Sequence, residues 1–219
     1  MTRMIPIIAA ALIIIGGAAY FLMPSSGGTN LPQLGAANAQ TVENVDELGI
    51  TEMILGDPAA PIQIVEYASY TCPHCKRFHE GAFKDLKAEY IDTGKVAFTY
   101  REVYFDRFGL WASMVARCGG EERFFGITDM LYAQQGLWTN GAPADIANNL
   151  RTIGKTAGLT EAELDACFTD GAKAQNLVAW FEANAAADAV RSTPTFIIDG
   201  RSYSNMSIAE FRNILDAKL

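Results

Sequence analysis

Two cysteines three residues apart, Cys72 and Cys75, are the residues of this chain best suited to chemistry. They follow the run Ile-Gln-Ile-Val-Glu-Tyr at residues 62–67, which has the apolar and β-branched character of a strand. Pro73 lies between them, and proline is favoured at the first position of a helix because its missing N–H is not needed there. The pattern therefore predicts a strand, a short loop and a helix whose first turn carries both thiols.

A thiol at the start of a helix is a stronger acid than a free cysteine, because unpaired backbone N–H groups and the helix dipole stabilise its thiolate. Such a thiol leaves readily in thiol–disulfide exchange, and a ring closed over so few residues is strained and easily reduced. We therefore predict a redox-active disulfide rather than a structural one. Cys72, nearer the helix start, is the expected nucleophile that forms the mixed disulfide, and Cys75 is the thiol that leaves.

Three neighbouring residues, Pro73, His74 and Glu66, are expected to tune the redox chemistry of this pair. His74 can donate a hydrogen bond to the Cys72 thiolate or place positive charge near it, and either effect would stabilise the reduced form. Glu66 has the strand parity of Ile62 and Ile64, which predicts that its side chain points to a buried face. The alternative interpretation places Glu66 at a solvent-facing strand end and gives His74 no role.

Composition narrows the class of protein. The chain has 219 residues, half of them apolar, which is enough for one core of ordinary domain size. Its formal net charge is -8 and its lysines and arginines do not cluster. Binding of nucleic acid through a basic surface is therefore not expected.

Residues 1–39 have the features of a targeting segment. Arg3 precedes an apolar run over residues 4–23, and Ala37-Asn38-Ala39 offers a small-x-small cleavage site. The apolar run is also long enough for a membrane anchor, so this segment is a signal peptide or a retained anchor. Both interpretations place the catalytic part outside the cytoplasm, because the positive charge stays on the cytoplasmic side. Residues 40–51 are interpreted as a linker.

The two remaining cysteines, Cys118 and Cys167, share no motif. An even number of cysteines in an exported protein favours disulfides, so the simplest interpretation is a structural disulfide between two helices. Closing a loop of that length would stabilise the fold by roughly 3–4 kcal/mol in the chain-entropy model. A regulatory pair that tunes the redox potential of the first two cysteines is the alternative.

Local patterns predict a helical block between two groups of strands. From residue 108 to residue 189 the chain is rich in Ala, Leu, Glu and Gln with helical spacing, and glycine-containing breaks divide it into several helices. The expected strands are 52–55, 62–68, 95–103, 195–198 and 201–203, and the other expected helices are 73–91, bent at Gly81, and 207–218, with Ser207 and Glu210 as a capping box. Without the helical block, the order predicts an α/β sheet with helices on its faces.

These residues resemble the DsbA family, the periplasmic thiol–disulfide oxidases of the thioredoxin superfamily. The resemblance is carried by Glu66-Tyr67-x-x-Tyr70-x-Cys72-Pro73-His74-Cys75, by Thr193-Pro194-Thr195-Phe196 and by the helical block between them. The stretch 110–126 is similar to the branch found in alphaproteobacteria. The resemblance implies an α/β thioredoxin fold with an inserted all-helical domain, in which residues 52–106 plus 190–219 form the thioredoxin-like domain and residues 107–189 form the insertion.

The resemblance also implies roles for single residues and for partners. Glu66 would be an isolated buried acid beneath the active site that accepts the proton of Cys75. Pro194 would be a cis-proline in a loop that faces the disulfide, and Thr193 would offer backbone groups to an extended substrate strand. The expected protein is a periplasmic monomer without cofactor or metal. Its substrates would be reduced, unfolded exported polypeptides, and a DsbB-type quinone-linked thiol oxidase of the inner membrane would recharge it.

Three other functions fit parts of the same pattern. A reductase or isomerase of the same compartment would keep the cysteine pair reduced, although such proteins often dimerise through an added N-terminal domain, for which residues 29–44 are too short. A metal-binding protein would use Cys72, Cys75 and His79, which lie nearly on one face of a helix. A passive chaperone would use only a groove for unfolded polypeptide.

Overall fold

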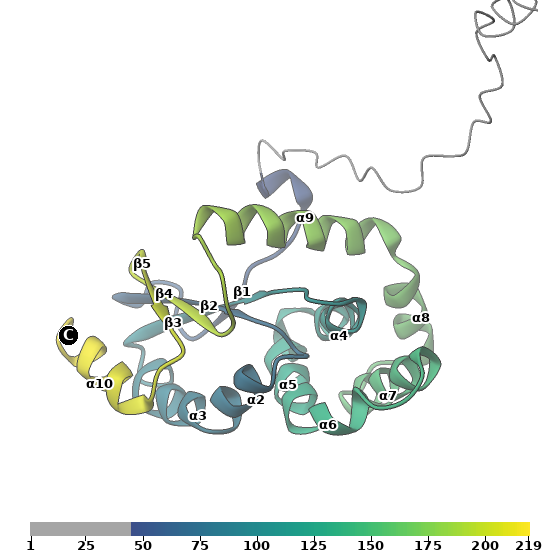
Figure 1. Cartoon of the computed structure of the whole chain (residues 1–219), viewed down its shortest axis with the longest axis horizontal. Helices are drawn as coiled ribbons and strands as arrows, with labels where there is room; N and C mark the ends of the chain where they lie inside the picture. Colours follow the sequence, from purple (N-terminus) through teal and green to yellow (C-terminus); the bar gives the residue numbers. More distant parts are fainter. Residues whose placement is uncertain (1–44) are drawn as a thin grey trace, which may run out of the picture. The chain divides into compact units, whose positions relative to one another are not determined.

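A computed structural model of the chain describes residues 45–219 (Figure 1). The predicted signal peptide or anchor at 1–39 and the first part of the predicted linker lie outside the described residues. None of the helices within 45–219 combines the length and the apolar composition needed to cross a bilayer. The later part of the predicted linker contains a short 3-10 helix, η1 (Val45–Leu48), and Asn176 donates a hydrogen bond to the Leu48 carbonyl (3.0 Å).

A mixed five-stranded sheet forms the centre of the fold. Its strands are β1 (Met53–Leu55), β2 (Ile62–Ala68), β3 (Val96–Glu102), β4 (Thr195–Ile198) and β5 (Arg201–Ser204), in the spatial order β1-β3-β2-β4-β5. β2 and β3 are parallel, whereas the other neighbouring strands are antiparallel. The five strands are those predicted, and their ends differ by no more than one residue from the expected ones.

Three short helices connect the parallel strands β2 and β3, which need such a crossover. They are α2 (Pro73–Glu80), α3 (Ala82–Leu86) and the π-helical η2 (Lys87–Ile91). The bent helix predicted over 73–91 is thus divided, and the first break lies at Gly81, whose backbone angles (φ -119°, ψ -101°) leave the helical region. The last helix, α10 (Ile208–Asp216), begins with the predicted capping box of Ser207 and Glu210.

The chain between β3 and β4 is helical, as predicted. Its helices, which together form the helical segment, are α4 (Arg107–Cys118), α5 (Gly120–Ala133), α6 (Gln135–Trp138), α7 (Pro143–Thr156), α8 (Glu161–Thr169) and α9 (Gly171–Ala187). Figure 1 shows α4 to α8 beside the sheet and α9 along one of its faces, opposite α2, α3 and α10. The helical segment therefore both extends the molecule sideways and covers one face of the sheet.

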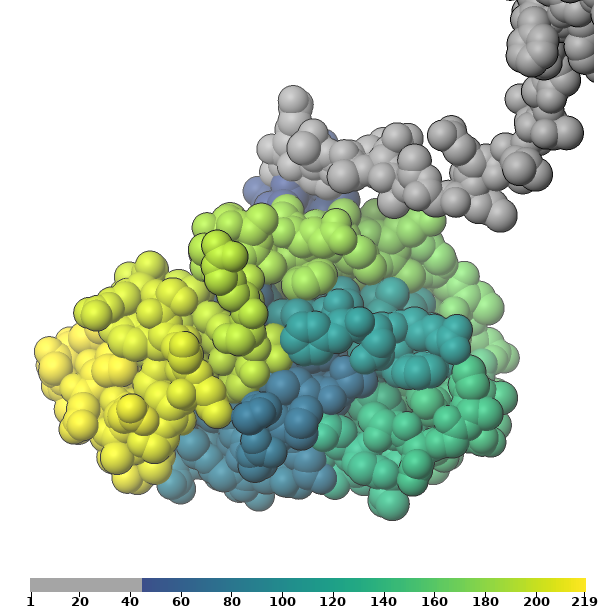
Figure 2. Space-filling view, viewed as in Figure 1, coloured from purple at the N-terminus to yellow at the C-terminus, as the bar shows by residue number. Residues whose placement is uncertain are grey.

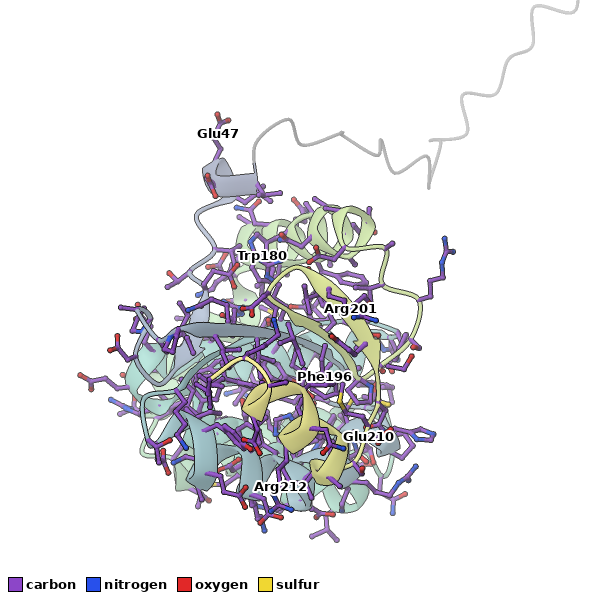
Figure 3. The ribbon with its side chains drawn as sticks, turned by 90° about the vertical axis from the view of Figure 1, so that its left-hand side faces the viewer. Glu47, Trp180, Phe196, Arg201, Glu210 and Arg212 are labelled. Atoms are coloured by element: carbon purple, nitrogen blue, oxygen red, sulfur yellow. A yellow bond between two sulfur atoms is a disulfide. The ribbon has the colours of Figure 1, made fainter. Side chains whose placement is uncertain are left out.

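The alternation of side chains along β2 separates two apolar layers. Ile62 and Ile64 belong to the layer on the side of α2, α3 and α10. In this layer Phe196, which is labelled in Figure 3, packs against Phe211 of α10, with ring centroids 4.9 Å apart. Tyr67 belongs to the other layer, under α9. Because both faces of β2 are covered, this strand can hold the active-site loop rigidly at its end.

A buried ion pair joins β3 to the helical segment. Glu102 accepts hydrogen bonds from Nε and Nη2 of Arg117 (2.7 and 2.6 Å) and from the hydroxyl of Ser113 (2.8 Å). Arg117 also donates to the carbonyl of Thr51 (2.8 Å). The side chains of the pair are 2% and 1% exposed, so these bonds replace the water that both charges lost on folding.

The ion pair gives a prediction for stability. Arg117→Met should lower the free energy of unfolding by about 3–5 kcal/mol, because it leaves the Glu102 carboxylate buried without its cation. Urea denaturation of the purified protein measures the change. Lys87→Met, which breaks the exposed pair with Asp92, is the matched control and should cost less than about 1 kcal/mol. Equal small losses in the two variants would contradict the role given to the buried pair.

Candidate active site

Cys72 and Cys75 lie at the start of α2, directly after the loop that follows β2. Cys72 is the N-cap residue with extended backbone angles (φ -83°, ψ 121°), and Pro73 is the first helical residue. Both cysteines are free thiols; Cys72 is 8% exposed, whereas Cys75 is fully buried. Figure 2 shows the blue surface of this region between the yellow C-terminal part and the green helical segment. Cys72 is therefore the sulfur that another molecule can reach.

The loop before β4 brings Thr193 and Pro194 to the thiol. β2 and β4 are antiparallel, with Tyr67 opposite Thr195, so the residues before Thr195 lie beside the residues after Tyr67. The Thr193–Pro194 peptide bond is cis, and the Thr193 carbonyl oxygen lies 3.6 Å from Sγ of Cys72. The sheet thus places next to the cysteine two residues that follow it by more than half the length of the chain.

The two sulfurs have opposite acidities. A hydrogen bond from the Cys75 thiol is the largest of the effects that lower the pKa of Cys72, and Thr193 and the backbone N–H groups of Cys75 and His74 add to it. Burial opposes these donors, and the net effect lowers the pKa of Cys72 to about 5. Burial raises the pKa of Cys75 far above its ordinary value, and the bond to Cys72 and the charge of Glu66 act in the same direction. At neutral pH the pair is therefore one thiolate and one thiol.

His74 faces Cys72 with its backbone N–H, and the predicted effect of its imidazole on the thiolate stays a prediction. The side chain is exposed, and its Nδ1 accepts a hydrogen bond from Nη2 of Arg77 (2.8 Å). The peptide N–H of His74 is among the main groups that stabilise the thiolate, and the ring is not. The physical reason is that the residue after Pro73 presents its N–H to the N-cap sulfur while its side chain points to solvent.

Glu66 is fully buried, on the β2 face that its parity predicts, but it is not isolated. Its Oε2 lies 2.8 Å from Nε2 of His79, which is buried as well. His79 follows Cys75 by one helical turn, so both side chains lie on the buried face of α2. The expectation of a carboxylate in a purely apolar setting is therefore wrong, because α2 brings the imidazole of His79 against Glu66. Among residues 45–219, no group of three His, Cys, Asp or Glu side chains is arranged to hold a metal ion.

Two contacts that position the motif come from residues that the sequence did not single out. Gln135 of α6 is buried, and its Nε2 donates to the carbonyls of Tyr70 (2.7 Å) and Cys72 (3.1 Å). Asp106, the N-cap of α4, accepts a hydrogen bond from the hydroxyl of Thr71 (2.9 Å). An aspartate before a helical run is a recognisable N-cap signal, whereas nothing local distinguishes Gln135 from a surface glutamine.

Cys118 and Cys167 form a disulfide, with the sulfurs 2.06 Å apart. The bond joins the last residue of α4 to α8. The structural interpretation of these two cysteines predicts such a bond between two helices.

A mixed sheet of this order, a CxxC pair at a helix start and a facing cis-proline together define a thioredoxin-fold protein with a dithiol site. The family model described as thioredoxin matches residues 49–217. The chain therefore belongs to the thioredoxin family.

Comparison with known proteins shows a more specific similarity of this chain, to DsbA. A Rickettsia bellii protein named as a protein-disulfide oxidoreductase is 34% identical over 170 residues, which cover 75% of this chain and 63% of that protein. The chain thus spans less than two thirds of the length of this relative. The crystal structure of Wolbachia pipientis alpha-DsbA1 has a TM-score of 0.71 at 27% identity and covers 80% of this chain and 95% of its own.

A further similar structure carries a different functional name. The crystal structure of a protein-disulfide isomerase from Novosphingobium aromaticivorans has a TM-score of 0.65 at 26% identity, with 76% of this chain and 96% of that chain covered. The predicted thioredoxin fold and the resemblance to DsbA are confirmed by these similarities.

The acidity of Cys72 can be measured in the reduced protein. Alkylation by iodoacetamide should titrate with a midpoint at pH about 5, against about 8.5 for a free cysteine. Cys75→Ser keeps a donor beside the thiolate and should titrate close to the unmodified protein, whereas Cys75→Ala should titrate at higher pH. A midpoint near that of free cysteine in the unmodified protein would contradict the hydrogen-bonding scheme.

Proposed function

We propose that the chain is an exported thiol–disulfide oxidase that donates the Cys72–Cys75 disulfide to reduced, unfolded polypeptides. The observation that carries the proposal is the position of Cys72 at the N-cap of α2 beside the fully buried Cys75, which lowers the pKa of Cys72 to about 5. A stable thiolate favours the reduced form of the pair. The disulfide is correspondingly a strong oxidant.

The size of this preference follows from the pKa. Neutral pH lies about two units above a pKa of about 5, and each unit favours the reduced form by about 1.4 kcal/mol. The total of about 3 kcal/mol corresponds to ~60 mV in a two-electron couple. The reduction potentials of reducing thioredoxin and of protein disulfide isomerase differ by ~90 mV. The thiolate alone therefore raises the reduction potential of the pair by a large part of that difference.

The exchange begins when a substrate thiolate attacks Sγ of Cys72. The disulfide breaks, and Cys75 leaves as a thiolate that takes up a proton, because burial disfavours its charge. Glu66, buried beneath the pair, is the proposed proton donor and acceptor. A second substrate thiolate then attacks the substrate sulfur of the mixed disulfide and releases the Cys72 thiolate. The substrate gains a disulfide, and a DsbB-type quinone-linked oxidase removes the two electrons from the enzyme.

Surface features beside the thiol suit an unfolded polypeptide. The cis-proline loop offers the backbone of Thr193 to an extended chain. Phe105 is 62% exposed and precedes Asp106, which holds Thr71 next to Cys72. An exposed aromatic side chain at this place can contact apolar segments that a folded protein would hide. The helical segment, proposed as an inserted domain over 107–189, would form one wall of this groove.

The proposed compartment is the periplasm, where the protein would act as a monomer. The Cys118–Cys167 disulfide supports this location, because disulfides persist in oxidising compartments. Residues 1–39 would provide the signal for export or the anchor in the inner membrane.

A reductase or isomerase of the same compartment is the second candidate. The similarity to the Novosphingobium aromaticivorans protein-disulfide isomerase favours it, and the same cysteines would carry out its chemistry. The isolated pair differs between an oxidase, in which the dithiol is the more stable form, and a reductase, in which the disulfide is the more stable form. The redox equilibrium of the isolated protein separates an oxidase from a reductase.

Trapping variants and the redox equilibrium test the proposal together. Cys75→Ala should accumulate mixed disulfides with exported polypeptides in cells, because Cys75 can no longer displace the polypeptide from Cys72, and Cys72→Ala should accumulate none. Against glutathione, the equilibrium of the unmodified pair should lie far to the reduced side, as quantified by alkylation and gel shift.

Lys76→Ala, a variant at a half-buried position of α2 beside the motif, is the control and should neither trap substrates nor move the equilibrium by more than a few-fold. A pair that is strongly oxidised at equilibrium would support the reductase. Full biological activity of Cys72→Ala, Cys75→Ala would instead point to a passive chaperone.

The second disulfide is proposed to be structural. Cys118→Ala, Cys167→Ala should lower the free energy of unfolding by up to about 4 kcal/mol, since the bridge closes a loop of 49 residues. The glutathione equilibrium of Cys72 and Cys75 should stay unchanged in the same variant. A shifted equilibrium without loss of stability would support the regulatory interpretation.

A further inference from the structure

Each catalytic cycle moves a proton through a site that is closed to solvent. Cys75 gains a proton when it leaves the disulfide and loses it when the disulfide forms again. Cys75 and Glu66 are both fully buried. The proton that Glu66 exchanges with Cys75 therefore needs a path between Glu66 and water.

The Glu66–His79 pair has free hydrogen-bonding capacity at both ends. Oε2 of Glu66 and Nε2 of His79 are 2.8 Å apart, and the side chains are 0% and 2% exposed. Oε1 of Glu66 and Nδ1 of His79 are buried and have no hydrogen-bond partner among the described residues. An imidazole can accept a proton at one nitrogen while it releases one from the other. The pair is thus built to pass a proton along its length.

A cavity of about 250 Å³ is bounded by residues of α2, α3, η2 and α5. His79 forms part of its wall, and the charged residues that line it are Glu80 of α2, Lys84 of α3, Lys87 of η2 and Asp129 of α5. Asp129 and Lys84 are exposed, so the cavity reaches solvent. Its volume is sufficient for several water molecules, and the charged side chains in its wall can bind them.

Aromatic rings fix the orientation of the imidazole. Tyr132 stacks on His79, with ring centroids 4.3 Å apart and planes at 16°, and Phe83 lies at 4.6 Å. The hydroxyl of Tyr132 bonds to the hydroxyl of Tyr100 (2.6 Å) and donates to the carbonyl of Ser69. Burial raises the pKa of both tyrosines well above 10.0, so they stay neutral and do not compete for the proton.

We propose that His79 is the proton relay between Glu66 and the water of this cavity, beside Asp129. The inference rests on the proposed role of Glu66 and extends it. When the disulfide forms, Cys75 gives its proton to Glu66, Glu66 gives one to Nε2 of His79, and Nδ1 releases one to water. When the disulfide is reduced, the same steps run backwards. Formation and reduction of the disulfide together therefore return the imidazole of His79 to its first tautomer in each cycle. Over the whole cycle, Glu66 and His79 neither gain nor lose a proton.

The attack of Cys75 on a mixed disulfide isolates the outward step. Reduced protein is mixed with saturating glutathione disulfide, which forms the Cys72–glutathione bond, and the rate at which Cys75 displaces glutathione is followed against pH. His79→Gln should lower this rate by roughly 10²-fold, the low end for general acid–base catalysis. Asp129→Asn should lower it less and shift the pH profile, because Asp129 is a titratable group in the wall of the cavity that takes up the proton.

Chemical rescue separates a relay from a packing role. His79→Ala leaves space next to the cavity, and added imidazole should raise its rate in proportion to concentration. Phe83→Ala, which opens the same wall and keeps His79, is the matched control and should not respond to imidazole. Unchanged rate and pH profile in His79→Gln would overturn the relay, as would a slow His79→Ala that ignores imidazole while its circular dichroism remains native.

Rate and equilibrium keep this inference apart from the proposed function. The relay changes how fast Cys75 reacts, whereas the oxidase assignment depends on where the glutathione equilibrium lies. A glutathione equilibrium that shows a reducing pair would refute the oxidase. The effect of His79→Gln on the rate at which Cys75 displaces glutathione would still test the relay.

Discussion

The hydrogen bond between the two sulfurs couples the acidity of one cysteine to the burial of the other. Cys75 donates to Cys72 because its own charged form is too costly in the interior, and Cys72 is a stable thiolate because this donor and the helix N–H groups face it. The same contact disappears when the disulfide forms. The energy of the reduced state, and with it the oxidising strength of the pair, therefore depends on keeping Cys75 buried and Cys72 at the helix start.

The fold maintains this arrangement from three separate parts of the chain. β2 and α2 position the cysteines, the loop before β4 places Thr193 against Cys72, and Gln135 of the helical segment binds the carbonyl of Cys72. The parallel pairing of β2 with β3 and the antiparallel pairing with β4 bring the ends of these segments to one edge of the sheet. The helical segment is consequently part of the active-site support as well as a covering of the sheet.

Two buried acidic side chains of the sheet, Glu102 of β3 and Glu66 of β2, each face a basic partner on a helix. The Glu102–Arg117 pair is almost fully satisfied by hydrogen bonds and ties β3 to α4. The Glu66–His79 pair, equally buried, has one unpaired atom at each end. A satisfied pair holds two elements together, whereas an unsatisfied one retains a cost that a purely structural pair would avoid. This difference is why the first pair is interpreted as structural and the second as functional.

The strands, most helices and the cysteine pair follow from local sequence, because the patterns that determine them extend over only a few residues. The run at 62–67, the motif at Cys72 to Cys75 and the capping box at Ser207 each carry their own signal. Only the tertiary structure shows that Glu66 binds His79 and that Gln135 binds Cys72, since these partners are 13 and 63 residues apart. Long-range contacts depend on how elements pack. A side chain's partner across such a distance is decided by the folded chain as a whole.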